Sequence, residues 1–253
     1  DAGRVNTTGA NLTFIGKYSG KANTTASNNS FIGSNSGYSN TTGSNHAFFG
    51  INTGFDNVTG EKNTFFGNFA GRKNTASYNC FFGFQAGYYN TTGSKGCFFG
   101  RDAGKNNTTG TSNVFFGYRS GFTNTTGAQN SFFGYRSGFG NTTAPYNTFF
   151  GYKTGQSNTT GAKNCFFGAF SGDTVTTVGG LAFFGHNSGT ANTSGDQNAF
   201  FGYAAGAANT TGGENTFVGY KSGNANTTGA SNSVFGYNTQ TGNFSNCIVL
   251  GKG

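Results

Sequence analysis

Few side chains in this sequence could carry out acid, base or nucleophilic chemistry, and those that could do not cluster. The chain has two histidines, His46 and His186, and seven acidic residues among 253. No acidic residue pairs in sequence with a histidine, and no nucleophile motif or phosphate-binding loop stands out. Calcium-binding solenoids need an acidic residue in each turn, which seven acids cannot supply. The sequence therefore predicts no enzyme, no cofactor and no metal site.

The four cysteines are the remaining reactive groups. Cys80, Cys97, Cys165 and Cys247 all lie just before a hydrophobic pair that recurs along the chain, so we expect them in one column. Their spacing differs from the C-x2-4-C spacing of zinc sites. Cys80 and Cys97 are on neighbouring repeats, where stacking could bring them within disulfide reach. The alternative is that they are small residues filling a half-buried column.

Asn-Thr-Thr turns provide a third kind of candidate site, because Asn-x-Thr or Asn-x-Ser accepts asparagine-linked sugars. Asn, Thr and Gly also favour turns for backbone reasons alone. Threonine-linked sugars on the same turns are an alternative, and stacked threonines make ice binding another, although a turn presents no flat sheet face. The candidate glycosylation residues are Asn6, Asn23, Asn40, Asn57, Asn90, Asn107, Asn124, Asn141, Asn158, Asn192, Asn209 and Asn226.

A hydrophobic pair followed by glycine sets the period of the whole chain. The glycines that close these pairs are residues 16, 33, 50, 67, 83, 100, 117, 134, 151, 168, 185, 202, 219, 236 and 251. Most of them are 17 residues apart, whereas the interval from Gly67 to Gly83 is 16 and the last interval is 15. A fixed short period indicates a repeat architecture.

The repeat predicts strands rather than helices, because its short apolar runs lie between Gly and Asn turns. One repeat for each coil gives an all-β fold, a single elongated parallel β-solenoid (β-roll) of about 15 coils with a 17-residue repeat. We expect one repeat domain over residues 1–253, with coils marked from Phe14 to Gly251. An Asn two residues before most pairs, such as Asn130, is expected to hydrogen-bond to its equivalents along a ladder of amides.

Adjacent hydrophobic residues predict how the chain assembles. Neighbouring side chains on a strand point to opposite faces, so one member of each pair fills the interior and the other points outward. The outward members would form a stripe too large for a free surface, which predicts a homo-oligomer, as a trimer or an open filament. A corner that turns both rings inward is the alternative. The predicted assembly residues are Phe132 and Phe133, together with Phe14, Ile15, Val249 and Leu250 in the terminal repeats, where strand edges are uncapped.

Charge and hydropathy exclude several partners. The net charge is +8, but only 9% of residues are charged and no basic run occurs, so we expect no nucleic acid partner. No apolar run of about 18 residues occurs, so we expect no membrane span. The chain contains no methionine and so does not begin at its own start codon, which is compatible with secretion. Tyr118, Tyr135 and Tyr152, each followed by Arg or Lys, predict an exposed strip that could bind anionic glycans.

The repeats resemble the heads of trimeric autotransporter adhesins, the YadA-like left-handed parallel β-roll. The segments Asn232-Ser233-Val234-Phe235-Gly236 and Asn246-Cys247-Ile248-Val249-Leu250-Gly251 look like that family's Asn-Ser-Val-Ala-Ile-Gly strand motif. The other repeats keep the order Asn, small residue, hydrophobic pair and Gly, but use Phe-Phe and a longer period. The resemblance implies an extracellular or cell-surface, oligomeric, fibrous protein.

The function that we expect is therefore structural. The sequence predicts subunits of an extracellular filament or fibre that associate with one another, with sugars on the Asn-Thr-Thr turns. A trimeric adhesin head or tail-fibre segment that binds a surface ligand, such as a surface glycan, is the alternative.

Overall fold

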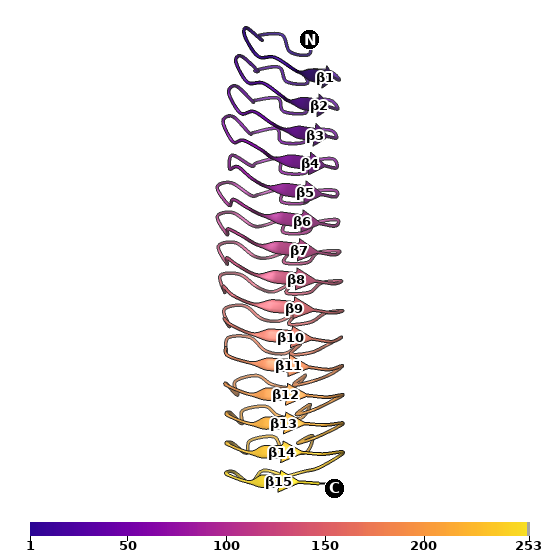
Figure 1. Cartoon of the computed structure of the whole chain (residues 1–253), viewed down its shortest axis with the longest axis vertical. Coiled ribbons are helices and arrows are strands. Elements are labelled where there is room, and N and C mark those ends of the chain that lie inside the picture. The colour runs from indigo at the N-terminus through magenta and orange to yellow at the C-terminus, as the bar shows by residue number, and fades with distance from the viewer. Residues whose placement is uncertain (252–253) are drawn as a thin grey trace. The chain divides into compact units, whose positions relative to one another are not determined.

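The computed structural model describes residues 1–251 and contains only β structure and turns within them. The chain divides into two compact units, Asp1–Gln129 and Asn130–Gly253. Within each unit, one short strand from every coil pairs in parallel with the strand of the next coil (Figure 1). The all-β parallel β-solenoid and its repeat of 17 residues are thus confirmed in both units. The extent of a single domain over residues 1–253 stays a prediction.

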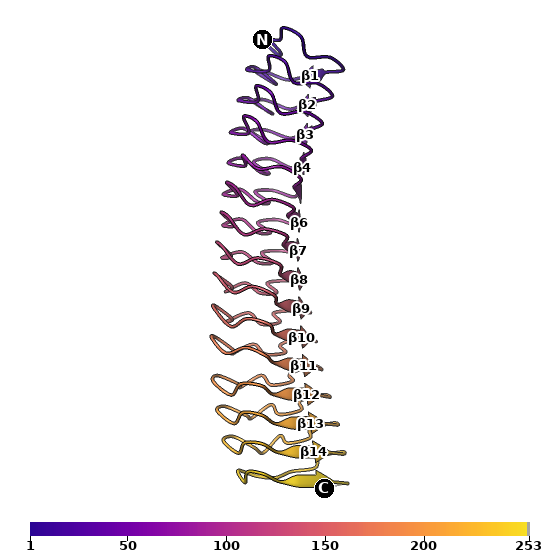
Figure 2. The same cartoon turned by 60° about the vertical axis from the view of Figure 1, so that its left-hand side comes forward.

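Every strand is three residues long. The first unit holds β1 (Thr13–Ile15), β2 (Ser30–Ile32), β3 (Ala47–Phe49), β4 (Thr64–Phe66), β5 (Cys80–Phe82), β6 (Cys97–Phe99) and β7 (Val114–Phe116). The second unit holds β8 (Ser131–Phe133), β9 (Thr148–Phe150), β10 (Cys165–Phe167), β11 (Ala182–Phe184), β12 (Ala199–Phe201), β13 (Thr216–Val218), β14 (Ser233–Phe235) and β15 (Ile248–Leu250). Figure 2 shows that the strands of each unit lie along one side of its coils, with the turns on the other side.

The first residue of each hydrophobic pair forms the core. Phe48, Phe65 and Phe81 are each 0% exposed, and their ring centroids lie 4.8 Å apart from one coil to the next. Because the strands pair without a register shift, each coil brings an equivalent ring to the same place. The second residue of the pair faces outward, as strand alternation predicts, and Phe116 is 53% exposed. The alternative in which both rings turn inward is therefore wrong.

Two glycines in each coil allow the chain to fold tightly around this ring. Gly37 has a φ of +57°, and a Cβ there would lie 2.6 Å from ring carbons of Phe31. Gly33 has a φ of +131°, and a Cβ there would collide with the carbonyl of Gly50 in the next coil. Both positions therefore need the free backbone and the missing side chain of glycine.

Buried asparagines two residues before the pair join each coil to the next. Asn147 Oδ1 accepts a hydrogen bond from the Asn164 N–H at 2.9 Å, and Asn147 Nδ2 donates to the Gly161 carbonyl at 2.9 Å. The expected bonding between equivalent asparagines is therefore present, but it joins the side-chain oxygen of one to the backbone N–H of the next rather than two side-chain amides. Each such bond stabilises the fold by about 0.5–1.5 kcal/mol, and leaving a buried amide unpaired would cost more.

The two members of one hydrophobic pair should differ sharply in their contribution to stability. Phe65→Ala removes a fully buried ring and leaves a cavity, so we expect a loss of about 3–5 kcal/mol. Phe66→Ala removes a ring that is already partly in water, and should cost less than about 2 kcal/mol. Urea unfolding at low protein concentration measures both values. Equal losses at the two positions would contradict the assigned inward and outward faces.

Candidate functional site

The asparagine of the Asn-Thr-Thr turn lies inside the coil and forms a second interior column. Asn107 Nδ2 donates to Asn90 Oδ1 at 2.6 Å and to the Gly110 carbonyl at 3.0 Å. An asparagine-linked sugar is attached at this nitrogen, so a buried and bonded amide has no room for one. Of the predicted glycosylation residues, Asn6 is exposed, and the buried ones are Asn23, Asn40, Asn57, Asn90, Asn107, Asn124, Asn141, Asn158, Asn192, Asn209 and Asn226. The folded chain thus argues against asparagine-linked sugars at the buried sites.

The two threonines of each turn have different surroundings. Thr108 Oγ1 donates to the Thr125 carbonyl of the next coil at 3.0 Å, and Thr24 makes the same bond to the Thr41 carbonyl at 3.2 Å. Thr109, the second threonine, is exposed, and its hydroxyl has no hydrogen-bond partner among the described residues. Each unit therefore carries a column of accessible threonine hydroxyls along its turns.

The second residues of the hydrophobic pairs form what we call the outer column of each unit. In the first unit the column is Ile15, Ile32, Phe49, Phe66, Phe82, Phe99 and Phe116. In the second unit it is Phe133, Phe150, Phe167, Phe184, Phe201, Val218, Phe235 and Leu250.

Ring stacking decides what the outer column presents to solvent. The rings of Phe49 and Phe66 are 4.4 Å apart with an interplanar angle of 8°, and those of Phe184 and Phe201 are 4.9 Å apart at 7°. Since each ring face is covered by the ring of the next coil, the column presents ring edges. It is therefore an apolar ridge rather than a platform of open aromatic faces.

The predicted assembly residues separate between the two faces of the strands. Ile15, Phe133 and Leu250 lie in the outer column. Phe14, Phe132 and Val249 are the first members of their pairs and belong to the inner column. Phe132 is fully buried, whereas Phe14 and Val249 lie in the terminal strands and are half-buried.

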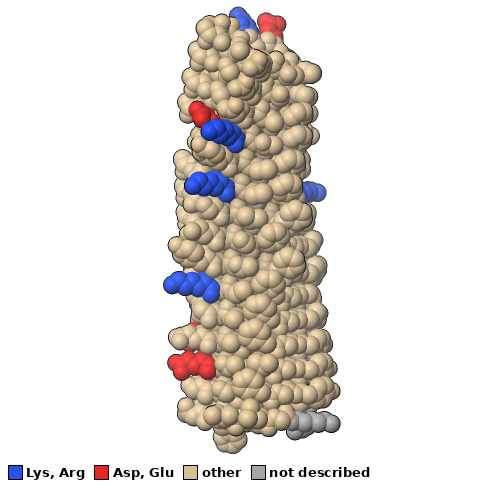
Figure 3. Space-filling view, in the orientation of Figure 1, with Lys and Arg blue, Asp and Glu red and all other residues tan. Residues whose placement is uncertain are grey.

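Charged side chains are scarce around the outer column. The residue before the pair points to the same side of the strand and is uncharged in every strand, as in Thr64 and Ala182. The residue after the closing glycine is often an aromatic one, and the rings of Tyr203 and Tyr220 stack at 5.2 Å. Figure 3, drawn from the same side as Figure 1, shows few charged side chains on this face.

Uniformity along the repeats distinguishes the outer column from other exposed positions. The residue three positions before the hydrophobic pair is exposed and varies. In successive coils it is Asn45, Lys62, Tyr78, Lys95 and Ser112. Such variation is typical of a solvated position, where most substitutions change stability little. The outer column instead keeps Phe, Ile, Val or Leu in every strand, and the second threonine of the turn is nearly constant. An exposed position that stays uniform indicates a contact or a modification.

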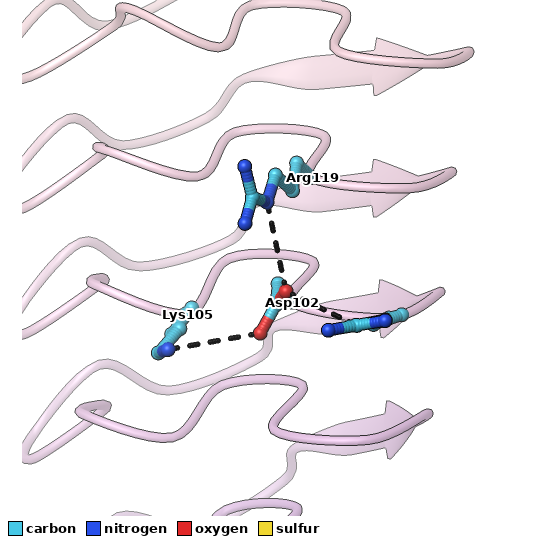
Figure 4. Close-up of polar contacts among 4 residues, drawn as sticks. Asp102, Lys105 and Arg119 are labelled. Carbon is cyan, nitrogen blue, oxygen red and sulfur yellow. Dashed lines mark ion pairs between the residues drawn. The ribbon is translucent and has the colours of Figure 1, made fainter.

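A buried carboxylate that the sequence analysis did not single out holds three basic side chains. Asp102 is 3% exposed, and its Oδ2 lies 3.5 Å from Arg101 Nε and 3.6 Å from Arg119 Nε. Its Oδ1 lies 3.7 Å from Lys105 Nζ (Figure 4). Asp102 and Arg119 are 17 residues apart, which is one repeat. This spacing is the sequence signal that could have identified the pair.

The basic side chains of the strip expected to bind anionic glycans already have partners within the chain. Arg119 lies over the ring of Tyr118 at 5.2 Å, besides its ion pair with Asp102. Lys153 lies over the ring of Tyr152 at 5.5 Å. Each contact between a basic group and a ring contributes about 0.5–1 kcal/mol at an exposed site. The basic groups are thus held against neighbouring rings of the same chain.

The cysteines do not share one column. Cys80 in β5 and Cys97 in β6 are direct strand partners and are both free thiols. Cys165 in β10 occupies the same column between two residues that are not cysteine. Cys247 lies one position earlier in its repeat, where its N–H donates to Asn232 Oδ1 at 2.9 Å. The expectation of one column for all four is wrong, because Cys247 ends the interior asparagine column.

Within residues 1–251 there is no pocket and no group of three His, Cys, Asp or Glu residues that could hold a metal ion. That part of the chain also has no helix of the length and hydropathy needed to cross a membrane. Comparison of the chain with protein families, with curated proteins and with solved structures finds no match.

His46 replaces asparagine in the interior column between Asn29 and Asn63. Its Nδ1 accepts the Asn63 N–H at 3.1 Å, and its ring stacks on Phe48 with centroids 4.6 Å apart. Burial lowers the pKa of His46 from 6.5 to about 4, because a charged imidazolium would lose its hydration there.

This shift predicts a loss of stability in acid. Between pH 6.5 and about 4 the unfolded state binds a proton at His46 that the folded state does not, so lowering the pH favours unfolding. We expect the loss to begin below pH 6.5, to be complete below about pH 4, and to reach about 3 kcal/mol. His46→Asn, which restores the residue found elsewhere in the column, should remove this component, whereas His186→Asn should leave it unchanged. Unfolding curves across this pH range that coincide for His46→Asn and the wild type would contradict the assignment.

Proposed function

We propose that this chain is a structural protein that associates with further copies of itself through the outer column, as a subunit of an extracellular filament or fibre. The observation that carries the proposal is a column that is partly exposed, apolar and uniform, while other exposed positions vary. Free surfaces rarely keep apolar patches of this extent. Interface cores are depleted in charge and enriched in aromatic residues, as this column is.

A second copy of the chain is the partner that fits the column best. Coils are spaced by the distance between paired strands, about 4.8 Å, so the ridge of a second copy repeats at the same interval. The net charge of +8 opposes association elsewhere on the molecule, but the outer column carries no charge. A sugar would pack on open ring faces, and here the neighbouring rings cover those faces.

The extracellular location rests on the resemblance of the repeats to YadA-like heads. A trimeric adhesin head built from the same chain would use the same lateral contact, so the two functions differ in what the assembly does rather than in how it forms. Filaments longer than one chain in electron micrographs would favour the fibre, and discrete short rods would favour the head.

Charges placed in the outer column should abolish association without unfolding the chain. We expect the wild type to form oligomers at micromolar concentration in sedimentation velocity. Phe82→Lys combined with Phe116→Lys should sediment as a monomer, because burying two unpaired ammonium groups costs more than the contact can supply.

The matched control carries the same two charges in the same coils on a different exposed column. Tyr78→Lys combined with Ser112→Lys should associate as the wild type does, and thermal unfolding should be similar for both double variants. A wild type that remained monomeric at high micromolar concentration, or an outer-column variant that still assembled, would refute the proposed contact.

We place the sugars of this proposed glycoprotein on the second threonine of the turns rather than on the asparagine. Its hydroxyl is exposed, and the residue is nearly constant although no hydrogen bond within the described residues requires it. The first threonine is excluded by its bond to the next coil.

Peptide mapping of protein from its natural source tests this placement. We expect added sugar mass on Thr109 and none on its neighbour Thr108 or on Asn107, as located by electron-transfer fragmentation. Treatment with an asparagine-specific glycosidase should leave the mass unchanged. Sugar on Asn107 would show that modification precedes folding, and would overturn the placement.

A further inference from the structure

Cys80 and Cys97 face each other across two coils of the first unit. They are Cα partners in β5 and β6, and both are half-buried residues on the outward side of the strands. Paired strands lie about 4.8 Å apart, which is within the 4.4–6.8 Å range of Cα separations that a disulfide spans. The Cα spacing of the two cysteines is therefore compatible with a disulfide between the coils of β5 and β6.

The two thiols already interact. Interaction with the neighbouring thiol lowers the pKa of Cys97 to about 7 and raises the pKa of Cys80. At neutral pH, Cys97 is therefore the better nucleophile, because the thiolate is the reactive form.

These cysteines lie close to irregularities in the repeat and in its interior asparagine columns. The repeat that leads into β5 is one residue short, since its turn at residues 74–77 lacks a position. In the coil before it, both amide atoms of Asn57 are buried without a hydrogen-bond partner. In the coil of β6, Gly96 occupies the position of the interior asparagine. Glycine has no side-chain oxygen that could accept a backbone N–H of the next coil.

We propose that Cys80 and Cys97 form a disulfide that fastens the coil of β5 to the coil of β6 at this irregular place. A low-molecular-weight disulfide is the oxidant. The Cys97 thiolate attacks one of its sulfurs, forms a mixed disulfide and releases one small thiolate. Cys80, giving up its proton, then attacks the Cys97 sulfur and releases the second small thiol. Two electrons pass from the protein dithiol to the small disulfide, which becomes two thiols.

The bond closes within one chain, so it does not depend on association through the outer column. It is a disulfide between neighbouring repeats, and it holds the two coils together when their interior bonds break. Cys165 is the internal control. It occupies the same column in β10, but its strand partners are Thr148 and Ala182.

The test uses the reduced, purified chain of 253 residues, incubated with oxidised glutathione near pH 7.5 under native conditions. Trypsin cuts between the two cysteines at Lys95, which places Cys80 in peptide 74–95 and Cys97 in peptide 96–101. We expect a linked species two hydrogen atoms lighter than the two peptides together, formed while Cys165 stays open to alkylation. The oxidised chain should also unfold at a higher temperature than the reduced chain.

Two variants separate the steps. Cys80→Ser should trap glutathione on Cys97, because the resolving thiol is gone, and Cys97→Ser should react more slowly at Cys80. Serine occupies this column in β2 and β8, so both variants have a precedent within the fold. The proposal is overturned if Cys80 and Cys97 remain fully alkylatable in the folded wild type, if they are oxidised no faster than Cys165, or if the linked peptides form only after denaturation.

Discussion

Every feature of this molecule depends on hydrogen bonds from each coil to the next, made without a register shift. The short strands and the first threonines bond to neighbouring coils, and the interior asparagines add bonds between coils to those within their own turn. Because the register is fixed, a residue type repeated in the sequence becomes a column in space. Within each unit the inner phenylalanines then stack into a core, and the outer ones become the partly exposed column on which we base the function.

The same constraint bends the backbone at places that carry no glycine. Asn52, Lys153 and Tyr78 have φ values of 54°, 53° and 65°. Such conformations cost roughly 1–2 kcal/mol for residues other than glycine. The cost is offset because the turned backbone still reaches the previous coil, as in the bonds from the Asn52 N–H to the Ser34 carbonyl and from the Lys153 N–H to the Tyr135 carbonyl, both 2.9 Å. The residue types at these corners vary, since the neighbouring coil and not the side chain sets the conformation.

The sequence predicted the parts of the structure that depend on spacing alone. A period of 17 and the alternation of side chains along a strand were enough for the solenoid and for one inward and one outward ring in each pair, whereas the structure was needed to assign Phe132 to the core and Phe133 to the outer face. They did not reveal where the turn asparagines point. An Asn-x-Thr motif is typical of surfaces, yet Asn107 turns inward because its amide bonds to Asn90. Contacts between repeats, such as Asp102 with Arg119, also escaped notice, because each is made by residues that vary from coil to coil.

The central claim is that the outer column is the surface through which copies of the chain meet. Electron cryomicroscopy of the assembled protein tests it most directly, because the position of each ring relative to a neighbouring subunit can be seen. The account predicts that Phe49, Phe66 and Phe82, with their equivalents along the column, lie between subunits and are buried there. A map in which the subunits meet through the threonine turns or the basic side chains, with the outer column facing solvent, would contradict it.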